Sequence, residues 1–168
     1  GVICRSQPGY RPNFPGSNPV GRRLLILELY CGTGSIGKAF RPRNYDVADL
    51  DWNKSLRPKP SHVCDIRKFN KHQYPPGHFY VIWMSPDCSQ FSSAHQGPRD
   101  YELADSLVQV GIDIIRYSKP PVWWAENPWT GQLRHRVVAE PLGQPHQVHY
   151  CKYYTEAEGN QVKKPTAL

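Results

Sequence analysis

From residue 24 onward, apolar residues gather in short runs that are separated by polar stretches rich in Gly, Pro and charged side chains. Runs such as LLILELY and FYVIWMS are continuous rather than alternating, as in strands that are buried on both faces of a sheet. Turn residues bound most of them. The pattern predicts strands at residues 24–30, 45–51, 61–66, 79–85, 120–127 and 146–154.

Two of the intervening stretches have helical character. Residues 34–40 (GSIGKAF) form a plausible short helix, and in residues 102–118 the apolar positions Leu103, Leu107, Val110, Ile114 and Tyr117 recur at steps of three and four. This is the spacing of an amphipathic helix. Strands that alternate with helices predict an α/β fold with a doubly wound, mostly parallel sheet, in which ligands bind at the carboxyl ends of the strands.

The pattern also divides the chain. Residues 1–23 contain four arginines and four prolines but no acid, which is typical of an irregular arm or linker. Residues 24–168 are expected to form one domain, with a polar loop at 155–164 before a possible last strand. Because the chain starts with glycine and ends inside an expected strand, we interpret it as a C-terminally incomplete piece of a longer protein.

Composition narrows the function classes. There are 21 Lys and Arg against 14 Asp and Glu, and the net charge of +7 favours a polyanionic partner. None of the five cysteines forms a Cys-x-x-Cys pair, so we expect reduced thiols in an intracellular protein and no metal site. No apolar run approaches the roughly 20 residues that a membrane helix needs.

Residues that could hold a nucleoside follow the first three expected strands. Gly32, Gly34 and Gly37 form G-x-G-x-x-G between a strand and a helix, although a plain glycine turn would look the same. Asp51 could accept hydrogen bonds from a ribose diol, with Trp52 as a flat face for adenine. Asp65 could accept from the amino group of adenine, with Ile66 packing on the ring. Taken singly, Asp51 with Trp52 fits an exposed acid beside a half-buried aromatic residue equally well.

The fourth and fifth expected strands end in reactive groups. Cys88 lies in SPDCSQFSS, a polar turn that suits a nucleophile better than a buried thiol. Glu126 follows an apolar run, where a carboxyl group can act as a proton donor, although it could equally cap the following turn.

In the order of these segments the chain resembles the cytosine-C5 DNA methyltransferases that use S-adenosyl-L-methionine (SAM), most closely the compact forms of phage, viruses and mobile elements. The segments are LELYCGTGSIGKAF, DLDWN, CDI, SPDCSQFS, AENP and HYCKYY…KKPTAL. The resemblance implies a Rossmann-like class I SAM-dependent methyltransferase fold. It also implies that the cofactor is bound by Leu29, Tyr30, Cys31, Gly32, Gly34, Ser35, Asp51, Trp52, Asp65, Ile66 and Pro86.

The resemblance also implies a mechanism. Cys88 would add to C6 of a flipped cytosine, Glu126 would bind or protonate N3, and Asn127 would hold the loop around Cys88. SAM would leave as S-adenosyl-L-homocysteine. DNA is the expected partner, RNA is a second possibility, and the compartment would be the nucleus in a eukaryote or the cytoplasm for a bacterial or phage protein.

Two positions depart from the family pattern. Asp87 separates Pro86 from Cys88, and an anion beside a thiol opposes thiolate formation unless it is paired or points away. By alignment, Ala167 stands where the family has an arginine that contacts the target base. We expect no target-recognition region within residues 24–168.

These departures keep other functions open. The chain could be a catalytically degenerate module that binds nucleic acid or a protein, or an RNA cytosine-C5 methyltransferase. An adenine amino-methyltransferase is disfavoured because NPW follows the fifth strand rather than the fourth. An NAD-dependent dehydrogenase would leave Cys88 and Glu126 unexplained.

Overall fold

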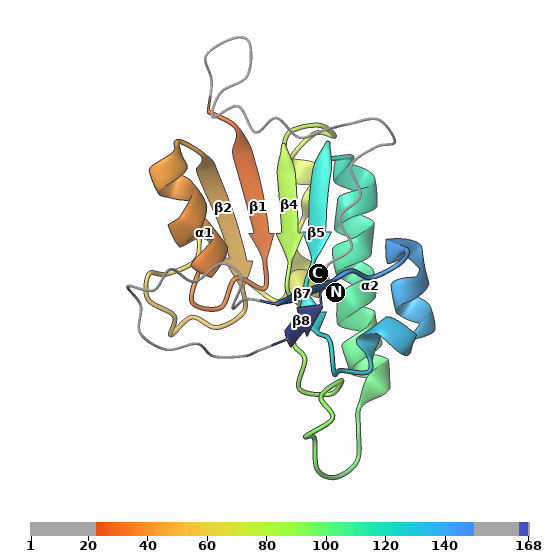
Figure 1. Ribbon diagram of the computed structural model, residues 1–168. Helices are drawn as coiled ribbons and strands as arrows, with labels where there is room; N and C mark the ends of the chain where they lie inside the picture. Colours follow the sequence, from red (N-terminus) through yellow and green to blue (C-terminus); the bar gives the residue numbers. More distant parts are fainter. Residues whose placement is uncertain (1–22, 150–164, 168) are drawn as a thin grey trace.

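The computed structural model describes residues 23–149 and 165–167, and its main feature is a five-stranded parallel sheet with the order β3-β2-β1-β4-β5 (Figure 1). This confirms the predicted α/β class with a Rossmann-like parallel sheet. The strands are β1 (Leu25–Leu29), β2 (Asp46–Asp51), β3 (His62–Val63), β4 (Val81–Met84) and β5 (Val122–Ala125).

The sheet is covered on both faces, which explains the continuous apolar runs. On β1, Leu27 and Leu29 pack in the cluster that includes α2 (Tyr101–Ser118), whereas Ile26 packs with Tyr45 on the opposite face. Both faces of this central strand are therefore removed from water. The short helix α1 (Ser35–Phe40) covers the second face, and Figure 1 shows α1 and α2 at opposite ends of the sheet.

Helix α2 begins and ends where the sequence pattern predicts. The Asp100 side chain accepts a hydrogen bond from the Leu103 backbone N–H at 2.9 Å, which caps the amino end. Gly111 lies where α2 crosses β4, since a Cβ atom there would come within 3.0 Å of Met84 Cε and 3.4 Å of the Tyr30 hydroxyl. The absence of a side chain lets the helix approach the sheet closely.

Some elements differ from the prediction. The third strand was expected at 61–66 but has only two residues, because the Asp65 side chain accepts from the Arg67 N–H and starts a 3-10 turn, η2 (Ile66–Lys68). Four further 3-10 turns were not predicted. They are η1 (Arg41–Arg43), η3 (Lys71–Gln73), η4 (Leu133–His135) and η5 (Val137–Leu142).

A second, three-stranded antiparallel sheet lies below β5 and has the order β6-β8-β7 (Figure 1). Its strands are β6 (Asn127–Pro128), β7 (Gln147–His149) and β8 (Pro165–Ala167). The sixth and the possible last strand of the prediction therefore join this small sheet, so far as they are described. The predicted arm up to residue 22, residues 150–154 of the sixth strand and the loop at 155–164 lie outside the described residues.

Within the described part of the chain, no helix combines the length and the apolar character needed to cross a membrane.

Candidate active site

The turn from β1 into α1 is shaped by left-handed backbone and by one buried acid. Tyr30, Gly32 and Gly34 have φ values of 59°, 51° and 70°. The Glu28 carboxylate, 3% exposed, accepts hydrogen bonds from the backbone N–H groups of Ile36 at 3.2 Å and Gly37 at 2.9 Å. Burial raises the pKa of Glu28, although these two bonds oppose the rise. Glu28 thus fixes the start of α1 and leaves the glycine turn open at the sheet edge.

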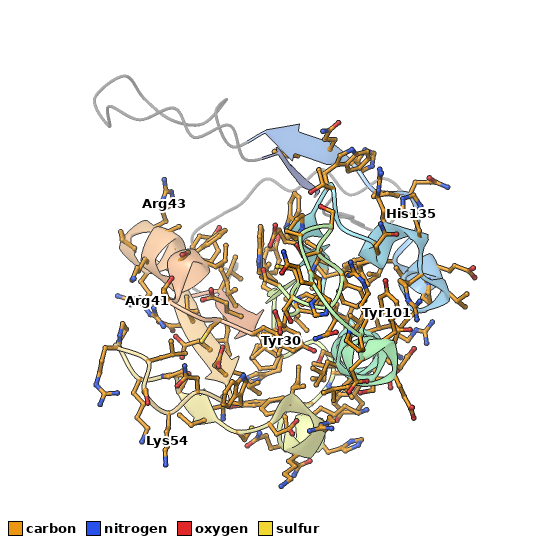
Figure 2. All side chains as sticks on the ribbon, turned by 90° about the horizontal axis from the view of Figure 1, so that it is seen from below. Tyr30, Arg41, Arg43, Lys54, Tyr101 and His135 are labelled. Carbon is orange, nitrogen blue, oxygen red and sulfur yellow. The ribbon has the colours of Figure 1, made fainter. Side chains whose placement is uncertain are left out.

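A cavity of about 630 Å³ opens at the carboxyl ends of β1 and β2, beside α2. Five residues predicted to bind a cofactor line it: Tyr30, Asp51, Trp52, Asp65 and Ile66. The Tyr30 hydroxyl donates to the Leu107 carbonyl at 2.5 Å and ties the turn to α2. Figure 2, which looks up from below at the strand ends of Figure 1, shows Tyr30 near the centre of this view. We call this space the nucleoside cavity.

The Asp51 carboxylate is already oriented by the backbone. It accepts from the N–H groups of Gly32 at 2.9 Å and Asn53 at 2.9 Å. Each carboxylate oxygen has a further lone pair for an external donor. Trp52 beside it is 75% exposed, so its ring presents an uncovered apolar face at the cavity.

The Asp65 carboxylate is engaged by a neighbouring guanidinium. Arg67 donates to it from Nε at 3.0 and 3.1 Å and from Nη2 at 2.5 Å, and the Arg67 backbone N–H donates at 2.9 Å. These side-chain and backbone bonds from Arg67 lower the pKa of Asp65 to about 2. Asp65 is therefore a fixed anion at the cavity wall.

The other predicted cofactor residues lie away from the lining of the nucleoside cavity. Leu29 is fully buried in the core, and Cys31 is 8% exposed, with burial raising the pKa of its thiol to about 12. The Gly32 N–H is bound to Asp51, whereas Gly34 and Ser35 begin α1. Pro86 is buried and lines a second cavity instead. These residues shape the backbone around the cavity rather than its walls.

Cys88 lies on the loop after β4 and is half-buried. The neighbouring Asp87 carboxylate accepts from the Ser89 N–H at 2.9 Å and from the Ser89 hydroxyl at 2.8 Å. Asp87 also lines the nucleoside cavity. Asp87, the residue that separates Pro86 from Cys88, is thus held by two hydrogen bonds from Ser89 within its own turn.

Asn127 joins the Glu-Asn segment to the cysteine loop. Its side-chain Nδ2 donates to the Pro86 carbonyl at 3.1 Å, and the side chain is buried, with 6% exposed. The Glu126 backbone N–H donates to the Met84 carbonyl at 2.8 Å. The two sequence segments predicted to carry the chemistry thus lie side by side. Cys88 follows β4, and Glu126 and Asn127 follow β5, which pairs with β4 in the sheet.

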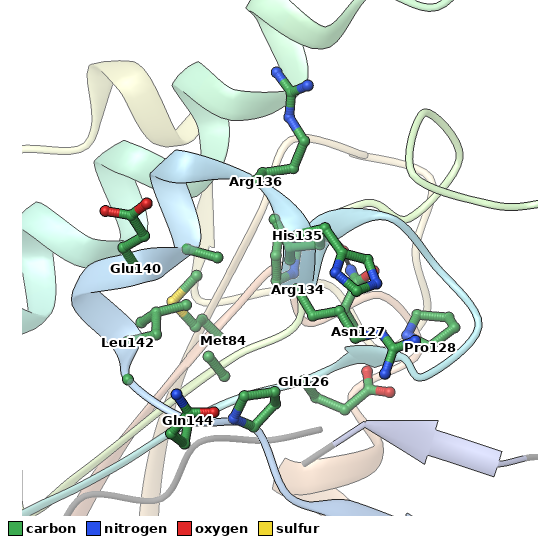
Figure 3. A pocket seen from close by; sticks show the side chains of 16 residues that line it. Met84, Glu126, Asn127, Pro128, Arg134, His135, Arg136, Glu140, Leu142 and Gln144 are labelled. Atoms are coloured by element: carbon green, nitrogen blue, oxygen red, sulfur yellow. Dashed lines mark hydrogen bonds between the residues drawn. The ribbon is translucent and has the colours of Figure 1, made fainter.

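A second cavity, of about 450 Å³, is lined by Pro86, whereas the flanking residues Ser85 and Asp87 line the nucleoside cavity. Its floor is apolar and includes Met84 and Leu142. In Figure 3 the side chains of Glu126, Asn127, Pro128, Arg134 and His135 lie at one end of this space, and Met84, Leu142 and Gln144 lie at the other. We call it the Glu126 cavity.

The backbone places Ala167 next to this cavity. Strand β8 pairs antiparallel with β6, and Ala167 is the partner of Asn127 in the register. The position that departs from the family pattern is therefore adjacent to the Glu-Asn segment.

Sequence reasoning missed several residues of the site. Arg99 donates to the carbonyl oxygens of Gln90 at 2.5 Å and Ser92 at 2.8 Å and so braces the loop after Cys88. Arg134 lies in the 3-10 turn η4, which no periodic pattern signals. The nucleoside cavity is further lined by Leu50, Cys64, Arg67, Ser85, Leu103 and Leu107.

The described residues hold no cluster of three or more His, Cys, Asp or Glu side chains suited to a metal ion.

Comparison with known proteins agrees with the sequence motifs. The chain is 28% identical over 149 residues to a protein of Frog virus 3 (isolate Goorha) named "Probable DNA (cytosine-5)-methyltransferase". The match covers 77% of this chain and 64% of the viral protein, so the chain spans less than two thirds of its relative's length. No family model matches the chain. The motifs and this relative together confirm that the chain resembles the cytosine-C5 DNA methyltransferase family.

Proposed function

We propose that residues 24–168 are the catalytic part of a SAM-dependent cytosine-C5 methyltransferase that acts on DNA. The observation that carries the proposal is the hydrogen bond from Asn127 to the Pro86 carbonyl. It holds the cysteine loop against the Glu126 segment, beside a cavity lined by a diol acceptor and an aromatic face. The viral relative supports the choice of reaction and of DNA as substrate.

The nucleoside cavity fits SAM in size and in chemistry. Its volume of about 630 Å³ is within the range of roughly 300–1,000 Å³ for small-molecule sites. Asp51 offers acceptors for a ribose diol, and Trp52 offers a stacking face for adenine. Asp51 and Asp87 line the cavity, which suits a ligand that is cationic at its sulfonium and amino groups, whereas Asp65 is already paired with Arg67. When bound, SAM supplies an electrophilic methyl group on that sulfonium.

The chain's own groups would carry the remaining chemistry. The Cys88 thiolate forms a bond from sulfur to C6 of cytosine, while a protonated Glu126 gives its proton to N3 and takes up the developing charge. C5 then has an enamine electron pair with which it accepts the methyl group. Loss of the C5 proton to water and cleavage of the S–C6 bond restore the ring and the thiolate, and N3 returns its proton to Glu126. The net change is one methyl group gained and one proton released.

Covalent trapping tests this proposal. We would incubate the protein and SAM with duplex DNA that contains 5-fluorocytosine. The C5 fluorine cannot leave as the C5 proton does, so the covalent adduct persists. We expect a denaturant-stable adduct with DNA that is absent in Cys88→Ala and strongly reduced in Glu126→Gln. An adduct that forms only with 5-fluorocytosine RNA would instead identify an RNA methyltransferase.

If neither polymer gives an adduct while SAM still binds, the chain is a non-catalytic binding module and the proposal is wrong. SAM binding is followed by isothermal titration calorimetry, with Trp52→Ala as the variant expected to weaken it. Lys119→Ala, at the exposed end of α2, is the matched control.

A further inference from the structure

This inference rests on the proposed function and concerns how negative charge is stabilised beside Glu126. When sulfur adds to C6, electron density moves toward N3 and the neighbouring carbonyl oxygen, O2. A carboxyl group placed at N3 serves one of these atoms, and a cation or hydrogen-bond donor beside it would serve the other. The described lining of the Glu126 cavity contains two guanidinium groups, Arg134 and Arg136.

Arg136 is already committed to another element. Its Nη2 and Nε atoms lie 2.5 Å and 3.2 Å from the two oxygens of Asp105 on α2. Its guanidinium carbon also lies 4.1 Å from the centroid of the Tyr101 ring. A guanidinium bound by a carboxylate and an aromatic face anchors η4 and η5 to α2, and its charge is compensated there.

Arg134 has a different environment. No ion pair joins it to any residue in the described ranges. Its guanidinium carbon lies 4.2 Å above the centroid of the Trp129 ring, on the same loop. A cation–π contact of this kind restrains the side chain yet leaves its N–H donors free for a ligand. Figure 3 shows Arg134 at the same end of the cavity as Glu126.

The described residues of β8 cannot supply this positive charge, because Pro165–Ala167 contains no cationic side chain. Ala167 is the register partner of Asn127, so it is the closest residue of β8 to the Glu-Asn segment, and its side chain is a methyl group.

We propose that Arg134 donates a hydrogen bond to O2 of the target cytosine while Glu126 serves N3, and that Trp129 holds the guanidinium in place. Arg134 is then a catalytic residue, because the contact strengthens as charge develops on O2. Arg134, on the 3-10 turn η4, would then make the contact to O2 that a cationic residue on β8 could have made.

The first experiment measures the rate of adduct formation on 5-fluorocytosine DNA. We expect Arg134→Gln to slow the adduct by about 10- to 100-fold, the usual range for losing a charged hydrogen bond. SAM affinity should not change, because Arg134 does not line the nucleoside cavity. Arg116→Gln, at an exposed position of α2, is the matched control and should react like the unchanged protein.

The second experiment asks whether the arginine acts on O2 rather than on folding. DNA with 5-fluoro-2-thiocytosine replaces O2 by sulfur, a weak acceptor, and adduct formation on it is compared with 5-fluorocytosine DNA, which keeps O2. We expect the unchanged protein to lose rate on the thio base and Arg134→Gln to show little further loss. In addition, Ala167→Arg introduced into Arg134→Gln should restore at least part of the rate.

The outcomes are distinct. Equal sensitivity of both proteins to the thio base, together with no restoration by Ala167→Arg, would show that Arg134 does not contact O2. Full activity of Arg134→Gln would overturn the inference by itself. If the unchanged protein forms no adduct at all, the proposed function fails first, and the inference fails with it.

Discussion

At the scale of single residues, the site depends on one buried amide. Asn127 donates to the Pro86 carbonyl from a position that is 6% exposed. Asn127→Ala leaves this acceptor without its partner, so we expect the free energy of unfolding to fall by about 1–3 kcal/mol. Urea denaturation would measure the change, with the exposed Thr130→Ala on the same loop as the control. A stability equal to that of the control would contradict the role of Asn127.

The cysteines are expected to differ in reactivity. Burial is the main cause that raises the pKa of Cys31 to about 12, and the nearby Glu28 adds to it. A raised thiol pKa means that the reactive thiolate is scarce at neutral pH. Below the pKa, the thiolate fraction rises about tenfold for each unit by which the pH is increased. We therefore expect Cys31 to resist iodoacetamide at pH 8 in the folded protein and to react in urea.

Peptide mass spectrometry of the Cys88→Ala variant would follow Cys31 without interference from the loop thiol. Rapid labelling of Cys31 in the folded protein at pH 8 would show that it is more accessible than its 8% exposure indicates.

At the scale of elements, the approach of α2 to β4 controls the nucleoside cavity. A Cβ atom at Gly111 would lie 3.0 Å from Met84 Cε and 3.4 Å from the Tyr30 hydroxyl. Alanine favours a helix by about 1 kcal/mol over glycine, but overpacking a core costs about 1–3 kcal/mol. We expect Gly111→Ala to be destabilising by roughly 1 kcal/mol and to weaken SAM binding, because Tyr30 borders the cavity.

Thermal unfolding and SAM titration would test Gly111→Ala. Arg116→Ala, in the same helix but exposed, is the control and should keep both the stability and the affinity. A more stable Gly111→Ala variant with unchanged affinity would show that α2 can move away from β4 at little cost.

The order of the elements could be predicted from sequence because each depends on local pattern. β1, β4 and α2 follow apolar runs or helical spacing, and the structure places them close to the predicted ranges. The small antiparallel sheet could not be predicted, because β6 has only two residues and its partner β8 is distant in sequence. Pairing of such short segments depends on the assembled fold rather than on their own composition.

The site could be predicted only in part, for the same reason. Ligands of parallel sheets bind at the carboxyl ends of the strands. This rule locates the residues at these strand ends, which are Asp51, Trp52, Cys88 and Glu126. Arg99 and Arg134 stand in irregular segments, and their contacts arise only from the path of the loops.

At the scale of the whole molecule, charge should govern encounter with DNA. The net charge is +7, and Figure 2 shows Arg41, Arg43 and Lys54 on the same side of the view, with Lys54 following the carboxyl end of β2. Contacts to phosphates release counterions, so the logarithm of the binding constant should fall linearly with the logarithm of salt concentration, by about 0.9 for each phosphate contacted. Fluorescence anisotropy on duplex DNA at several salt concentrations would measure this slope.

Lys54→Ala should make the slope shallower by about one unit if Lys54 contacts a phosphate. The change Glu102→Gln at an exposed position of α2, which removes no cation, should leave the slope as it was. A binding constant that does not depend on salt would exclude an electrostatic docking surface on this chain.

The Pro86 segment separates two cavities, and this separation has a consequence for kinetics. A cofactor that enters the nucleoside cavity and a base that enters the Glu126 cavity would approach from different sides of one peptide, so neither blocks the path of the other. We therefore expect random order of substrate addition, with initial-rate plots that intersect and product inhibition that shows no compulsory first ligand. The same partition would let one product leave while the other is still bound, so that successive turnovers need not wait for the protein to empty.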